Sequence, residues 1–152
     1  MLANPKPRWE LPNPEALAKL VNVVTTTMLR IRFEVAGQLT SAATYTHMAA
    51  IDFGGEHPLR IALASDDAGC HALCKALFGC EADSLEPWMI DDALCELCNM
   101  AAGQIKNAMA PDVLLTVPKV ITPPVLPVSP EGGRQLVLRA VEMHLLLSIS
   151  TQ

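Results

Sequence analysis

Apolar residues recur every three or four positions in three stretches of the chain, and this spacing predicts helices. The predicted helices run over about 13 to 30, over about 66 to 78, and from just after Ser84 to about Met109. Asn13 is expected to cap the first helix and the run Ser65-Asp66-Asp67 the second, which Gly79 is expected to close. The apolar face predicted for the first helix consists of Leu17, Leu20, Val21, Val24 and Met28.

Apolar and polar residues alternate between and after these helices, which predicts β-strands. The expected strands are Ile31 to Val35, Tyr45 to Phe53, Leu59 to Ala64, Gln135 to Val141 and Met143 to Ser150. Five prolines lie between Pro118 and Pro130, so a strand there must be broken or lie at a sheet edge. This order predicts an α+β domain with two long helices and a shorter one on a mainly antiparallel sheet.

Residues 1 to 12 contain three prolines and little apolar periodicity, so we expect a loose N-terminal arm before a single domain over 13 to 152. Within that domain, the octapeptide Glu15 to Asn22 lines up with Asp92 to Asn99 and shares Ala, Leu, Leu and Asn with it. Duplicated halves would explain this similarity, although two amphipathic helices can also match by chance.

Composition narrows the class of protein. Hydrophobic residues make up 51% of the chain, too many for a disordered segment, and the net charge of -5 argues against nucleic-acid binding. No apolar stretch approaches the ~20 residues that span a bilayer, and the first residues lack the apolar core of a signal peptide. We therefore expect a cytoplasmic protein without membrane contact, whose five cysteines stay reduced.

The longest predicted helix has two distinct faces. Its expected core face holds Ile90, Leu94, Leu97, Ala101, Ile105 and Ala108, and its opposite face holds Asp92, Glu96, Asn99, Gly103 and Asn107. Apart from Glu96, these outward residues are poor helix formers, and Gly103 costs roughly 0.5–1 kcal/mol relative to Ala. Close approach of another protein would explain this glycine, although an ordinary solvated face is the simpler alternative.

The run Asp92 to Gly103 resembles the signature helix of the CheC/CheX/FliY chemotaxis phosphatases. That signature is Asp or Ser, three residues, Glu, two residues, Asn, and a later proline, and this chain supplies Asp92, Glu96 and Asn99 at that spacing. The segment Thr116 to Ile121 also resembles the family's strand entry. Cys95 and Cys98 depart from the pattern, because the family usually has small residues there.

The resemblance implies the family's α+β fold and an enzyme that hydrolyses the aspartyl phosphate of a CheY-like response-regulator receiver. It implies that Asn99 positions the attacking water, that Glu96 anchors the receiver's active-site lysine, that Asp92 assists docking and that Gly103 admits the receiver. No cofactor of its own is implied, since the receiver would supply Mg²⁺. Lys19 stands where a second site would need a carboxylate, so a single site of the CheX type is expected.

Two alternatives remain open. The same fold could bind a receiver, or form a homodimer through its sheet as CheX relatives do, without catalysing hydrolysis. The cysteines, with Cys95 and Cys98 three positions apart, also include metal-ligand types. We favour a packing role for them and expect no metal site, because Cys98 falls on the core side of the helix and Cys95 at its flank.

Overall fold

The computed structural model describes residues 11–36, 45–109, 112–124, 133–141 and 143–151. Its helices are α1 (Pro14–Met28), α2 (Asp67–Phe78) and α3 (Pro87–Met109), and a 3₁₀ turn covers Ala82–Ser84. Both predicted N-caps are confirmed, because the Asn13 and Asp66 side chains accept hydrogen bonds from the amides of Ala16 and Gly69. Gly79 ends α2 at φ 67°, a left-handed conformation that glycine adopts without strain.

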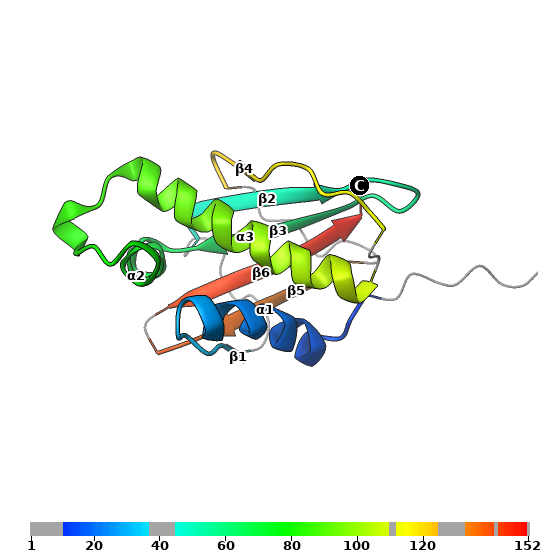
Figure 1. Cartoon of the computed structure of the whole chain (residues 1–152), viewed down its shortest axis with the longest axis horizontal. Coiled ribbons are helices and arrows are strands. Elements are labelled where there is room, and N and C mark those ends of the chain that lie inside the picture. Colours follow the sequence, from blue (N-terminus) through cyan, green and yellow to red (C-terminus); the bar gives the residue numbers. More distant parts are fainter. Residues whose placement is uncertain (1–10, 37–44, 110–111, 125–132, 142, 152) are drawn as a thin grey trace, which may run out of the picture.

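Six strands form one antiparallel sheet behind the helices (Figure 1). They are β1 (Glu34–Val35), β2 (His47–Phe53), β3 (Leu59–Ser65), β4 (Lys119–Val120), β5 (Arg134–Arg139) and β6 (His144–Thr151). Their order across the sheet is β1-β5-β6-β3-β2-β4, so the two-residue strands β1 and β4 lie at the edges. The α+β prediction is confirmed, and the described part of the proline-rich segment contributes a short edge strand, β4.

The strand order contains a pseudo-twofold symmetry. Exchanging β1 with β4, β2 with β5 and β3 with β6 reverses the order and leaves every strand with equivalent neighbours. The helix α1 packs against β1 and β5, and α3 packs against the corresponding strands β4 and β2. Each half is therefore one long helix followed by three strands, with α2 inserted between the halves, as the similarity of the two octapeptides suggested.

Side chains on the two faces of the sheet enter different apolar clusters. On β3, Ile61 and Leu63 pack into the main core beneath the helices, whereas Ala62 and Ala64 belong to a second cluster on the opposite face.

Two predicted limits need correction. The predicted strand from Ile31 to Val35 is reduced to its last two residues, because the chain leaves α1 through a tight turn. Leu11, assigned to the loose arm, packs against the main core, whereas residues 1–10 lie outside the described residues.

Candidate functional site

The helix α3 presents the predicted polar ridge to solvent. Leu94, Leu97, Ala101 and Ile105 are buried, whereas Asp92, Glu96, Asn99 and Asn107 are exposed and Gly103 is half-buried. One core assignment was wrong, since Ala108 lies in the last turn of the helix and is exposed. The amphipathic pattern therefore placed the ridge correctly and failed at Ala108, in the last turn of the helix.

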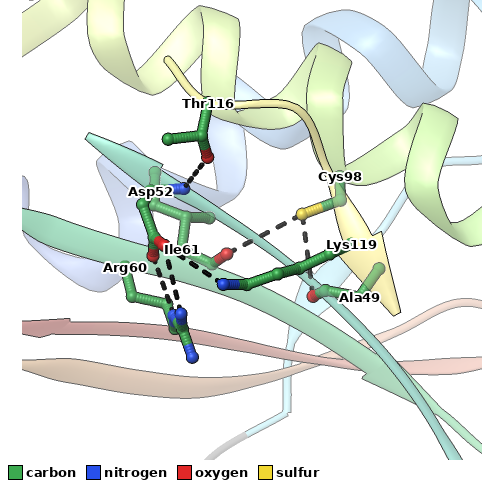
Figure 2. Close-up of polar contacts among 7 residues, drawn as sticks. All are labelled: Ala49, Asp52, Arg60, Ile61, Cys98, Thr116 and Lys119. Carbon is green, nitrogen blue, oxygen red and sulfur yellow. Dashed lines mark hydrogen bonds and ion pairs between the residues drawn. The ribbon is translucent and has the colours of Figure 1, made fainter. Parts of the chain in front are cut away.

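Cys98 lies on the side of α3 that faces the sheet. Its side chain is fully buried, and its Sγ contacts the backbone carbonyl oxygens of Ala49 at 3.7 Å and Ile61 at 3.8 Å (Figure 2). Burial raises the pKa of the Cys98 thiol to about 12, so the group stays protonated and donates to these carbonyls. Because Cys98 points into the sheet, its neighbour Asn99 is turned outward.

Glu96 and Asn99 lie one turn apart on this outward ridge. At a rise of 1.5 Å per residue their Cα atoms are separated by about 4.5 Å along the helix axis. Neither side chain has a hydrogen-bond or ion-pair partner within the part of the chain that the structure describes. The carboxylate and the amide are thus free to contact another molecule together.

The corresponding asparagine of the first half is used differently. The Asn22 Nδ2 donates to the Phe33 carbonyl at 2.8 Å, and its Oδ1 accepts from the Phe33 amide at 2.8 Å. The hydroxyl of buried Thr25 also donates to Oδ1, at 3.2 Å. Both ends of the Asn22 amide are therefore occupied by the connection that leads into β1, and Lys19 beside it is exposed.

Gly103 borders a groove between α1 and α3 of about 370 Å³. Apart from its own helix backbone and chain neighbours, no atom of the described residues would lie within 4 Å of a Cβ added at this glycine, so their packing does not require it. The opposite wall contains Val23 and Met28, whose side chains are 52% and 54% exposed. The prediction that Met28 lies on the core face of α1 is wrong, because its side chain lines this groove beside α3 instead of entering the core.

The segment that follows α3 is fastened to β2 by polar contacts that the sequence analysis did not identify (Figure 2). The Asp52 amide donates to the Thr116 hydroxyl at 2.9 Å, and the Thr116 amide donates to the Asp52 carbonyl at 2.9 Å. The Asp52 carboxylate accepts hydrogen bonds from Arg60 Nε at 2.8 Å and from Arg60 Nη2 at 3.1 Å. It also forms an ion pair with Lys119, whose Nζ lies 3.6 Å away. The hydrogen bond from Arg60 and the two nearby cations lower the pKa of Asp52.

The remaining cysteines are mostly interior side chains. Cys70 and Cys74 are buried, and burial raises the pKa of their thiols to about 12 and about 11. Cys95 is half-buried at the flank of α3, as its position in the helix predicted. Among the described residues, no three His, Cys, Asp or Glu side chains are arranged to hold a metal ion. The described helices also include none with the length and apolar character needed to cross a bilayer.

A family model described as chemotaxis phosphatase CheX matches residues 47–140, a range that includes Asp92, Glu96, Asn99 and Gly103. The chain belongs to the CheX family. A search of curated proteins finds no match for it.

Solved CheX structures share the fold at low sequence identity. The CheX protein of Vibrio vulnificus superposes with a TM-score of 0.73 at 13% identity, covering 99% of this chain and 100% of the other. CheX of Desulfovibrio desulfuricans gives a TM-score of 0.69 at 16% identity, covering 91% and 97%. A similar fold is found in the Borrelia burgdorferi complex of CheX, CheY, BeF₃ and Mg²⁺, with a TM-score of 0.72 at 17% identity, covering 94% of this chain and 99% of the other.

Proposed function

We propose that this CheX family member hydrolyses the aspartyl phosphate of a CheY-like response-regulator receiver, with Asn99 positioning the attacking water. The observation that carries the proposal is the exposed pair of Glu96 and Asn99 on α3, which has no partner among the residues that the structure describes. Membership of a family described as chemotaxis phosphatase supports the reaction type. The structural neighbour from Borrelia burgdorferi, solved as a complex with CheY, supports the class of partner.

The chemistry requires little from the phosphatase. An aspartyl phosphate is an acyl phosphate, so its P–O bond to the carboxylate is already weak, and the receiver holds it with its own Mg²⁺. The Asn99 amide offers one acceptor and two donors without a negative charge that would repel the phosphoryl group. Its oxygen can accept a hydrogen bond from water and place the water in line with phosphorus.

The neighbouring residues are proposed to hold the receiver. Glu96 would pair with the lysine of the receiver's active site, which orients Asn99 toward the phosphoryl group and keeps the carboxylate away from it. Gly103 leaves open space where the receiver backbone could approach the helix. Asp92, exposed one turn before Glu96, would extend the docking surface.

The test measures phosphate release from CheY-like receivers of the same organism, phosphorylated with acetyl phosphate, in the presence and absence of this protein. We expect Asn99→Ala to reduce the protein-dependent rate by about 100-fold or more while retaining binding to a receiver carrying beryllofluoride. Glu96→Ala should weaken binding itself, because it removes the proposed anchor.

Asn107→Ala is the matched control, since this exposed asparagine lies on the same side of α3 but outside the Glu96–Asn99 pair. It should leave the maximal rate nearly unchanged. Binding of a receiver without any acceleration of phosphate release would replace the enzyme by a non-catalytic receiver-binding module. An Asn99→Ala variant with the wild-type rate would exclude the assigned role of this residue.

A further inference from the structure

A second hollow lies away from the α3 ridge, between the end of α1, the helix α2 and the connection from β5 to β6. Its volume is about 540 Å³, within the range of roughly 300–1,000 Å³ typical of small-molecule sites. No residue of α3 lines it, so the proposed phosphatase surface does not account for it. The alanines Ala72, Ala76 and Ala140 form part of its wall, and their small side chains leave the space open.

Three cations surround this hollow. Arg30 and Arg32 come from the turn after α1, and Lys75 comes from the last turn of α2. None of the lining residues that the structure describes is a carboxylate, and none of the three cations has an ion-pair partner among the described residues. By contrast, Arg60 and Lys119 contact Asp52. The three cations make this hollow locally positive in a chain whose net charge is -5.

The backbone around Arg30 is held in a conformation that few residues other than glycine adopt. Arg30 has φ 57°, in the left-handed region. The carbonyl of buried Thr25 accepts hydrogen bonds from the amides on either side, Leu29 at 3.0 Å and Ile31 at 3.1 Å. These two bonds fix the turn, so the two arginines start from a rigid backbone at the rim of the hollow.

We propose that this hollow binds a nucleoside phosphate. Guanidinium groups donate paired hydrogen bonds to phosphate oxygens and also stack on planar rings, and Lys75 adds a third positive charge. The apolar wall, which includes Leu29, Val141 and Met143, suits a base or sugar face. A long polyanion fits less well, because it would extend beyond the hollow, and a protein with a net charge of -5 would repel it there.

A structural role for the cations makes a different prediction. Arg30 and Lys75 lie near the C-terminal ends of α1 and α2, where positive charge stabilises a helix. If that were their only role, their removal would lower the melting temperature and no nucleotide would bind. Ligand binding and thermal stability must therefore be measured on the same variants.

The experiment is isothermal titration of the whole protein with ATP, ADP, AMP, adenosine and inorganic phosphate, at low and at moderate salt. We expect one-site binding of the nucleotides that weakens with salt, and weaker binding of both adenosine and inorganic phosphate. Absence of saturable binding for every nucleotide at millimolar concentration would overturn the proposal. Inorganic phosphate binding as tightly as the nucleotides would also overturn it.

Two variants locate the site. Arg32→Gln combined with Lys75→Gln should weaken nucleotide binding by about tenfold for each cation removed, whereas Lys19→Gln on the exposed side of α1 should not. Ala76→Phe keeps every charge and should block binding by filling the hollow. Wild-type nucleotide affinity in both the double variant and Ala76→Phe would overturn the assignment. Receiver phosphate release should be unchanged in both, which separates this test from that of the proposed phosphatase.

Discussion

Asn22 and Asn99 occupy matching positions in the long helices of the two halves, and their side chains have opposite surroundings. The Asn22 amide is closed by two hydrogen bonds to the backbone of Phe33, whereas Asn99 is exposed and has no partner among the described residues. The same residue type therefore holds a loop in one half and is available to a partner in the other.

This contrast predicts different consequences for the same substitution. Asn22→Ala should lower the free energy of unfolding by about 1–3 kcal/mol, because the half-buried amide and carbonyl of Phe33 lose their partner. Asn99→Ala should leave that free energy within about 0.5 kcal/mol of the wild type, since an exposed side chain is removed. Urea unfolding measures both, and equal destabilisation by the two changes would contradict the distinction.

A second prediction concerns Gly103. Gly103→Ala should raise the free energy of unfolding by roughly 0.5–1 kcal/mol, because alanine is the better helix former and its Cβ meets no atom within 4 Å. The same variant should bind the receiver more weakly if Gly103 admits its backbone. Thermal unfolding measures the change in stability, and titration with the receiver measures the change in affinity. A more stable variant with unchanged receiver affinity would remove Gly103 from the docking surface.

The Asp52 cluster predicts a dependence on pH. The hydrogen bond from Arg60, followed by the charges of Arg60 and Lys119, lowers the pKa of Asp52 from its ordinary 3.8. A lowered pKa in the folded state stabilises the protein above pH 3.8, and this stabilisation is lost as the pH falls through the lowered value. Asp52→Asn should therefore be less stable than wild type near neutral pH, by about 1 kcal/mol.

The difference between wild type and Asp52→Asn should narrow as the pH falls below 3.8. Urea unfolding over this pH range measures it, with Asp112→Asn as a control at an exposed carboxylate. A difference that stays constant or widens in acid would show that Asp52 acts through packing and not through its charge.

The cysteines predict an order of chemical reactivity. Thiolates are the reactive form, and burial raises the pKa of Cys98 and Cys70 to about 12, so both should resist iodoacetamide in the folded protein. The half-buried Cys95 should react before these two thiols but slowly, because burial and then the charges of Asp91 and Asp92 raise its pKa. Peptide mass mapping with and without denaturant measures this order. Labelling of Cys98 at the rate of Cys95 would contradict the burial of the Cys98 thiol.

The sequence predicted those features that depend on local periodicity. The apolar stripe of α3 located the ridge of Glu96 and Asn99, and cap residues such as Asn13 and Gly79 marked where helices begin and end. Periodicity failed in the last turns of two helices, where Met28 and Ala108 fit the apolar stripe but are exposed.

Features that join distant segments were not predictable in this way. The ion pairs of Asp52 with Arg60 and Lys119 depend on the register of β2 against β3 and β4, which no local pattern specifies. The hollow beside Arg30 and Arg32 likewise requires α2 and the β5–β6 connection to meet the end of α1. The residue types of both sites can be read from the sequence, but which of them lie close together depends on the tertiary structure.

The residues on the exposed side of α3 also determine how a peptide of this helix would behave outside the domain. Asp92, Asn99, Gly103 and Asn107 all disfavour helix formation, so the 23 residues of α3 depend on the packing of their buried side to remain helical. A free peptide of this sequence would be largely unfolded in water and would make a poor competitor for a receiver. The geometry of Glu96 and Asn99 therefore exists only while the sheet beneath them is intact.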